Sequence, residues 1–199
     1  MKFVFLFFIV LLISNNSYTQ SYLYSGLFNV SGEATISYSN SEQEYIGKIT
    51  QTEIKFAPAG SYFIIDKLSI GIELSYNYFE KNSDEPVDIK DIEMFLGFGP
   101  VIKYYFFDKN LSPFVKAGYS HNIFNITDSY FRTRKSFPGF STVIGVGVNY
   151  FITNSLALET SLDYVYSRKQ IEIYDTNSSV FLISNKKTFS LSIGLSYFL

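Results

Sequence analysis

The chain has 199 residues, a net charge of −2, a single His and no Cys. The lack of Cys excludes a disulfide framework and a lipid-anchored cysteine, and no basic cluster indicates a nucleic-acid partner. Aromatic residues make up 19% of the chain and charged residues only 17%, a balance that is unusual for a soluble protein.

The N-terminus has the layout of a secretory signal peptide. Lys2 precedes an unbroken apolar run over residues 3–13, and a polar stretch with small residues follows over 14–19. This pattern predicts a signal peptide over 1–19, cleaved after Thr19, and a mature domain over 20–199. The apolar run is shorter than the ~20 residues that a membrane-spanning helix needs. The alternative is a buried N-terminal helix or strand.

The mature chain alternates between apolar and small or polar residues. Ile70 and Ile72 share one face of their segment, for example, and Gly71 and Glu73 share the other. A period of two predicts β-strands. Eight segments follow this rule: 28–38, 54–62, 68–78, 92–104, 111–119, 140–150, 156–166 and 189–199.

One short phrase recurs where these segments meet. It consists of an aromatic pair, a tight polar turn and a leucine that opens the next strand. The copies cover residues 62–68, 104–111 and 150–156, and the chain ends within a fourth at Tyr197-Phe198-Leu199. Three turns of one kind predict hairpins that open in the same direction, with both ends of the domain on the turn side. This is the plan of an up-and-down barrel.

The space inside an eight-stranded barrel decides which face of each strand points inward. The apolar rows carry five or six large side chains per strand, too many for an eight-stranded interior. The other rows are rich in Gly and Ser, which suit a narrow lumen. The apolar rows therefore face lipid, and the first and last strands pair because an open edge is not tolerated there. The alternative is a soluble barrel with an apolar cavity.

The stretch from Pro58 to Gly71, with its aromatic pair, Asp66-Lys67 turn and Leu68, resembles the strand-turn-strand signature of small bacterial outer-membrane β-barrel proteins. These porin-like proteins are similar in architecture to OmpA and OmpX. The resemblance covers essentially the whole mature chain and implies an all-β, eight-stranded antiparallel up-and-down transmembrane β-barrel in the outer membrane. It also implies contacts with membrane lipids and lipopolysaccharide, and recognition of the last strand by the barrel-assembly machinery. The last residue is Leu199, where the family usually has Phe.

Charged residues on the inward rows form the candidate site. They must be paired or hydrated, because an isolated buried ion is very costly. One interpretation is a path for ions or small solutes, and the other is a static plug of salt bridges. We favour the plug, because eight strands enclose little more than side chains. The set comprises Glu33, Glu53, Lys55, Glu73, Glu93, Lys103, Lys116, Glu159 and Asp163, and a periplasmic aromatic girdle is expected at Tyr62, Tyr104, Tyr150 and Tyr197.

His121 is the one candidate for catalysis, and Ser120 precedes it. Adjacent strand residues point to opposite faces, so Ser120 cannot serve His121 directly. We expect His121 at the outer rim and predict no catalytic residue, cofactor or metal site. A lipid-modifying hydrolase that uses His121 remains an alternative.

Long extracellular connections are predicted over residues 39–48, 80–90, 125–137 and 168–187. Asp84, Glu85, Asp88 and Asp91 make the second acidic and could hold a cation, and Arg132, Arg134 and Lys135 in the third could bind lipopolysaccharide phosphates. The plain alternative is solvated loops. The fourth continues to alternate around a turn at 175–178, which predicts a protruding hairpin able to bind a surface ligand by strand addition. We therefore predict a structural or surface-interaction role, with a narrow channel as the alternative.

Overall fold

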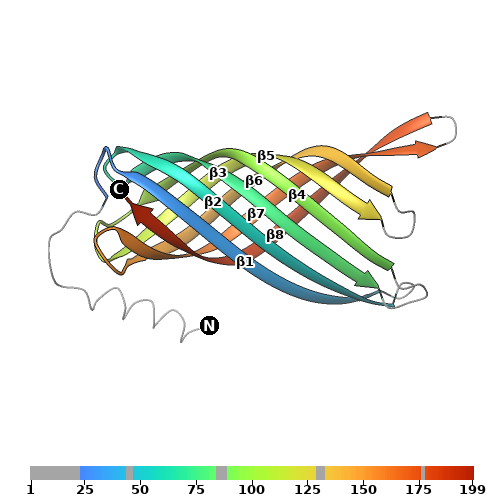
Figure 1. Cartoon of the computed structure of the whole chain (residues 1–199), viewed down its shortest axis with the longest axis horizontal. Coiled ribbons are helices and arrows are strands. Elements are labelled where there is room, and N and C mark those ends of the chain that lie inside the picture. Colours follow the sequence, from blue (N-terminus) through green and yellow to red (C-terminus); the bar gives the residue numbers. More distant parts are fainter. Residues whose placement is uncertain (1–22, 44–46, 84–88, 129–132, 176–177) are drawn as a thin grey trace.

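The chain forms a closed barrel of eight antiparallel strands in sequence order (Figure 1). This computed structural model describes residues 23–43, 47–83, 89–128, 133–175 and 178–199. The predicted barrel is confirmed, while the predicted signal peptide lies outside the described residues. The strands are β1 (Phe28–Gln43), β2 (Gly47–Ile65), β3 (Leu68–Ser83), β4 (Ile89–Tyr105), β5 (Leu111–Asp128), β6 (Thr133–Phe151), β7 (Leu156–Asp175) and β8 (Ser178–Phe198).

The two faces of the strands lie as the alternation predicts. On β3, Ile72 is 63% exposed on the outer surface, whereas Ser69 is 1% exposed in the lumen. Gly71 faces inward, and a Cβ at this position would lie 2.7 Å from Ser61 Cα. The small residues therefore occupy the tight interior and the large apolar ones the outside. Within the described residues, no helix is long and apolar enough to cross a membrane.

The repeated turns gather at one end of the barrel, which we call the turn end. The connection between β2 and β3 holds only Asp66 and Lys67, and Lys67 has a positive φ of 67°. The barrel closes at this end, where Phe28 N donates to Leu199 O at 3.1 Å and Leu199 N donates to Phe28 O at 2.7 Å. Both ends of the barrel domain thus lie on the turn side.

The opposite end, which we call the far end, differs from the sequence prediction. The prediction of long loops is wrong, because strand pairing continues as far as Ser83↔Ile89 and Asp128↔Thr133. Asp84, Glu85, Asp88 and Arg132 lie outside the described residues, whereas Asp91 lies on β4 and Arg134 and Lys135 on β6. The far-end parts of the strands lack the regular apolar row that identifies a strand in the sequence. The predicted β7–β8 hairpin is confirmed by pairs up to Asp175↔Ser178.

An aromatic cluster closes the lumen at the turn end. Four of its five aromatic rings are the second aromatic residue of a repeated pair. Phe63 stacks on Tyr105 at 5.7 Å, and Phe151 packs at a tilt on Phe198 at 5.0 Å, both between ring centroids. The N-terminal segment seals it from below, where Lys67 N donates to Leu23 O at 3.0 Å. We call this set the aromatic plug: Leu23, Leu27, Phe63, Tyr105, Phe114, Phe151, Ala157 and Phe198.

Candidate functional site

A buried ion network crosses the lumen directly above the aromatic plug. Lys103 on β4 and Lys116 on β5 are register partners, so two ammonium groups stand side by side on one wall. Three carboxylates reach them from other strands: Glu33 on β1, and Glu159 and Asp163 on β7. No side chain of the network is more than 5% exposed.

The contacts within the network are direct. Lys116 Nζ lies 2.8 Å from Glu33 Oε2 and 3.0 Å from Asp163 Oδ2. Lys103 pairs with Glu159 and stands 3.6 Å from Glu33 Oε1, so Glu33 bridges both cations. Pairing of this kind is what allows ions to remain inside a narrow, poorly hydrated barrel.

Small neighbours make room for these charges and satisfy part of their remaining hydrogen bonds, although Asp163 Oδ1 is buried without a partner. Ser196 Oγ donates to Glu159 Oε2 at 2.6 Å. A Cβ at Gly145 would collide with the Asp163 carboxylate and would lie 3.1 Å from Lys116 Cε. The small inward residues therefore have two roles. Gly145 leaves room for the charged side chains, and Ser196 donates a hydrogen bond to a carboxylate.

Lys55 and Glu73 lie apart from this network. Glu73 stands opposite Ala59, whereas Lys55 stands opposite Asn77, four residues nearer the far end of β3. Neither side chain has an ion pair or hydrogen bond among the described residues. Because neighbouring strands are staggered, both residues lie nearer the far end than Lys116. The partners of Lys116 come from across the lumen. Glu53 and Glu93 also face inward, but nearer the far end. They pair with Lys186 and Lys169, which are not among the inward charges predicted from the sequence.

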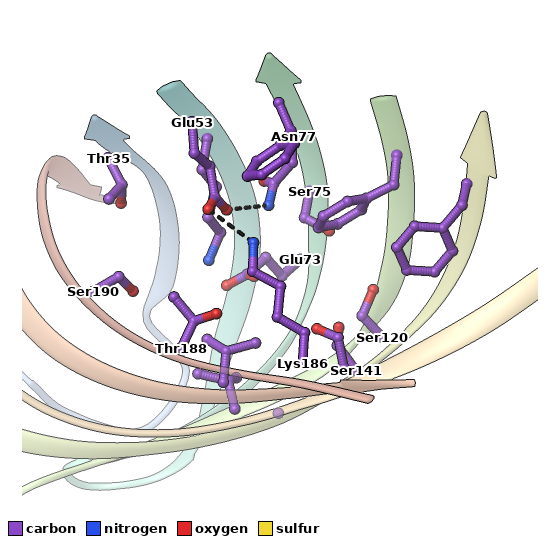
Figure 2. Close-up of a pocket in the computed structure, with 18 of the residues that line it drawn as sticks. Thr35, Glu53, Glu73, Ser75, Asn77, Ser120, Ser141, Lys186, Thr188 and Ser190 are labelled. Atoms are coloured by element: carbon purple, nitrogen blue, oxygen red, sulfur yellow. Dashed lines mark hydrogen bonds and ion pairs between the residues drawn. The ribbon is translucent and has the colours of Figure 1, made fainter. Parts of the chain in front are cut away.

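A cavity of about 290 Å³ occupies the lumen above the ion network (Figure 2). Lys186 Nζ lies 3.2 Å from Glu53 Oε2, and Lys169 Nζ lies 2.7 Å from Glu93 Oε1. Both lysines continue inward rows, but they lie in residues 168–187, for which the sequence predicts a connection. The remaining wall is largely apolar, with Phe79, Phe95 and Phe124 among its residues. Hydroxyl groups interrupt it at Thr35, Ser75, Ser120, Ser141, Ser167, Thr188 and Ser190.

Asn77 is the unusual group in this cavity. Its Nδ2 donates to Glu53 Oε1 at 3.2 Å, while its Oδ1 is buried without a hydrogen-bond partner. The residue is only 6% exposed and lines the cavity. A buried polar atom without a partner is costly, so Oδ1 is an acceptor available to a molecule in the cavity.

The tyrosines of the predicted girdle all lie on the outer surface beside the turns. Tyr62, Tyr104, Tyr150 and Tyr197 are 43–49% exposed, each at the turn end of its strand. Partly exposed aromatic rings in a row suit a membrane rim, where one part of the ring is apolar and the other hydrated. Their role in a rim stays a prediction.

The structure does not bring a catalytic set together around His121. Its ring is exposed on the outer surface and packs on Phe98, with 6.2 Å between centroids. Ser120 faces the lumen and donates to Asn122 Oδ1 at 2.8 Å. None of the described residues forms a hydrogen bond with the imidazole, and they contain no group of three or more His, Asp or Glu side chains placed to hold a metal ion.

The sequence matches the outer membrane protein beta-barrel domain over residues 7–197. The chain belongs to this family. It is an integral β-barrel protein of the bacterial outer membrane, embedded in that membrane's lipids. No curated protein sequence matches it.

Solved outer-membrane barrels share the fold at low sequence identity. OprG from Pseudomonas aeruginosa is 13% identical with a TM-score of 0.61, covering 90% of this chain and 99% of that one. AlkL is 16% identical with a TM-score of 0.51, covering 94% and 96%. The outer membrane enzyme PagL is 13% identical with a TM-score of 0.43, covering 85% and 98%. Likeness at this level concerns the fold and not the activity.

Proposed function

We propose that this barrel does not conduct solutes or catalyse a reaction, and that it serves as a structural and interacting element of the outer-membrane surface. The observation that carries the proposal is the double closure of the lumen. The aromatic plug and the ion network lie one above the other, and their side chains are almost fully buried.

A conducting path would need both layers to open together. Phe63 and Phe198 approach to 6.2 Å across the plug, and Glu33 joins cations from two strands above it. Opening would break buried ion pairs and expose charges to a poorly hydrated interior, which is strongly unfavourable. The alternative function, a narrow porin-like channel, would require this rearrangement.

Planar-bilayer recording tests the proposal. The wild-type protein should show no unitary current, and Lys116→Ala should lower the thermal midpoint without opening a conductance, because the aromatic plug stays in place. Proper folding of each sample is checked by the shift in gel mobility between boiled and unboiled protein. A reproducible single-channel current from folded wild-type protein would contradict the proposal and favour the channel.

The β7–β8 hairpin supports a role in surface interaction. β6 and β7 pair only as far as Gly139↔Lys169, whereas β7 and β8 continue to Asp175↔Ser178. The hairpin thus extends beyond the neighbouring strands (Figure 1), and its backbone edges are open to strand addition by a surface ligand.

Deletion of residues 172–182 tests the surface role. The shortened protein should keep its boiled and unboiled gel mobilities, since the ion network and plug are untouched, but should lose binding to host-matrix components in a cell-surface assay. Unchanged binding in correctly inserted protein would argue against the hairpin as the interaction site.

Export through a signal peptide over residues 1–19, contacts with lipopolysaccharide and recognition of β8 by the barrel-assembly machinery belong to the same proposal. The non-catalytic part is supported by the separation of Ser120 and His121 on opposite faces of β5. Lipid-A hydrolysis that requires His121 would contradict that part.

A further inference from the structure

The seam between β1 and β8 is joined over a shorter length than the other strand pairs of the barrel. Its pairing begins at Asn29↔Phe198 and ends at Ala34↔Ile193, whereas β1 stays paired with β2 as far as Gln43↔Gly47. Beyond the last pair, β1 and β8 diverge toward the far end of the barrel (Figure 1).

A side-chain hydrogen bond marks the point where the seam opens. Thr35 Oγ1 and Ser192 Oγ lie 2.7 Å apart, and the described parts of the two strands form no further backbone pair above them. Residues 35–43 of β1 and 178–192 of β8 therefore each carry one free backbone edge. We call the gap between these edges the seam notch.

The notch begins within the apolar band of the barrel. Phe189 on β8 stands opposite Tyr164, with 5.0 Å between their ring centroids, and Ile193 lies four residues nearer the turn end. Residues 189–192 thus have no strand partner on the side of the notch. The residues flanking the notch are the most exposed large apolar ones, Ile36 at 77% and Phe189 at 74%.

The lumen cavity lies directly behind the notch. Thr35, Thr188 and Ser190 line both (Figure 2), and Lys55 is the register partner of Thr35. The Lys55 ammonium has no ion pair among the described residues, and Lys186 extends from β8 on the other side of the gap. The free acceptor Asn77 Oδ1 opens into the same space.

We propose that the seam notch binds a phosphate-bearing lipid of the outer leaflet. The phosphate group lies against Lys55 and competes with Glu53 for the partly exposed Lys186. A donor of the head group reaches Asn77 Oδ1, and an acyl chain leaves between Ile36 and Phe189. Lipid is the molecule that surrounds the barrel, and it matches both the Lys55 ammonium, which has no ion pair among the described residues, and the apolar flanks. A strand from a second copy would satisfy the backbone edges but would leave Lys55 unpaired.

The absence of Trp from the chain allows a direct test, because a single introduced Trp reports on one position. Ser190→Trp probes the notch, Ser120→Trp probes the intact opposite wall of the cavity, and Phe189→Trp is the lipid-facing reference. In phosphatidylglycerol vesicles with brominated acyl chains, we expect fluorescence quenching of Ser190→Trp close to that of Phe189→Trp and well above that of Ser120→Trp. Equal, weak quenching at Ser190→Trp and Ser120→Trp would overturn the proposal.

A second variant tests the head group. Adding Lys55→Gln to Ser190→Trp should raise the mole fraction of brominated phosphatidylglycerol needed for half-quenching about tenfold, the loss expected for one charge-assisted contact. The matched control is Lys169→Gln, which removes a cavity lysine paired with Glu93 away from the seam and should leave that mole fraction unchanged. No change with Lys55→Gln, or a seam-to-seam cross-linked dimer that excludes brominated lipid, would also overturn it.

Discussion

The two halves of the lumen follow the same alternating pattern but are built in opposite ways. Near the turn end, aromatic rings and a buried ion network fill the space, and network side chains are at most 5% exposed. Toward the far end, the ion pairs are looser, with Lys186 53% exposed, and a cavity of about 290 Å³ remains. Inward polarity alone therefore does not decide whether a small barrel is filled. The size of the inward residues and their pairing across the lumen decide it.

Removing a charge from each half should give the largest contrast. Lys116→Ala leaves the carboxylates of Glu33 and Asp163 without their shared cation, and the free energy of unfolding should fall by ~3–5 kcal/mol. Lys186→Ala, the matched change in the far half, breaks a hydrated pair and should cost at most ~1 kcal/mol.

Thermal unfolding in detergent, read from the loss of the unboiled gel band with temperature, measures both variants. A Lys116→Ala midpoint as high as that of Lys186→Ala would mean that the two halves are equally tolerant. Loss of a charge would then destabilise the filled half no more than the open half.

Adding a methyl group should give a smaller contrast between the interior and the outer surface. A Cβ at Gly147 would press on the Phe114 ring of the aromatic plug and lie 2.6 Å from Thr160 O, so Gly147→Ala should cost ~1–3 kcal/mol. A Cβ at Gly60 meets only Phe28 Cζ at 3.5 Å, and Gly60→Ala should change stability by less than ~0.5 kcal/mol.

Equilibrium unfolding in urea in the presence of lipid vesicles would measure these two variants. Equal stability of Gly147→Ala and the wild-type protein would show that the turn-end half has room that its contacts do not indicate. A large loss in Gly60→Ala would instead point to strain on the outer surface.

Much of the candidate site could be placed by parity, and some of it could not. Parity put Glu33, Lys103 and Lys116 in the lumen, but it also put Glu73 and Lys55 in the same set, and the structure gives neither of these two an ion pair. Lys169 and Lys186 were missed because their rows continue into polar residues that resembled loops. The aromatic plug had a sequence signal in the second ring of each repeated pair, but its closure by Leu23 depends on how the N-terminal segment folds back.

The sequence by itself determined the number of strands, the position of the turns and the face on which each side chain lies, because these depend on a period of two and on local turn chemistry. Only the tertiary structure decided which inward residues meet across the lumen, how far β1 and β8 stay joined and where space remains. Those features depend on strand tilt and on the register of the closing pair, which join residues that lie as far apart in the chain as Asn29 and Phe198.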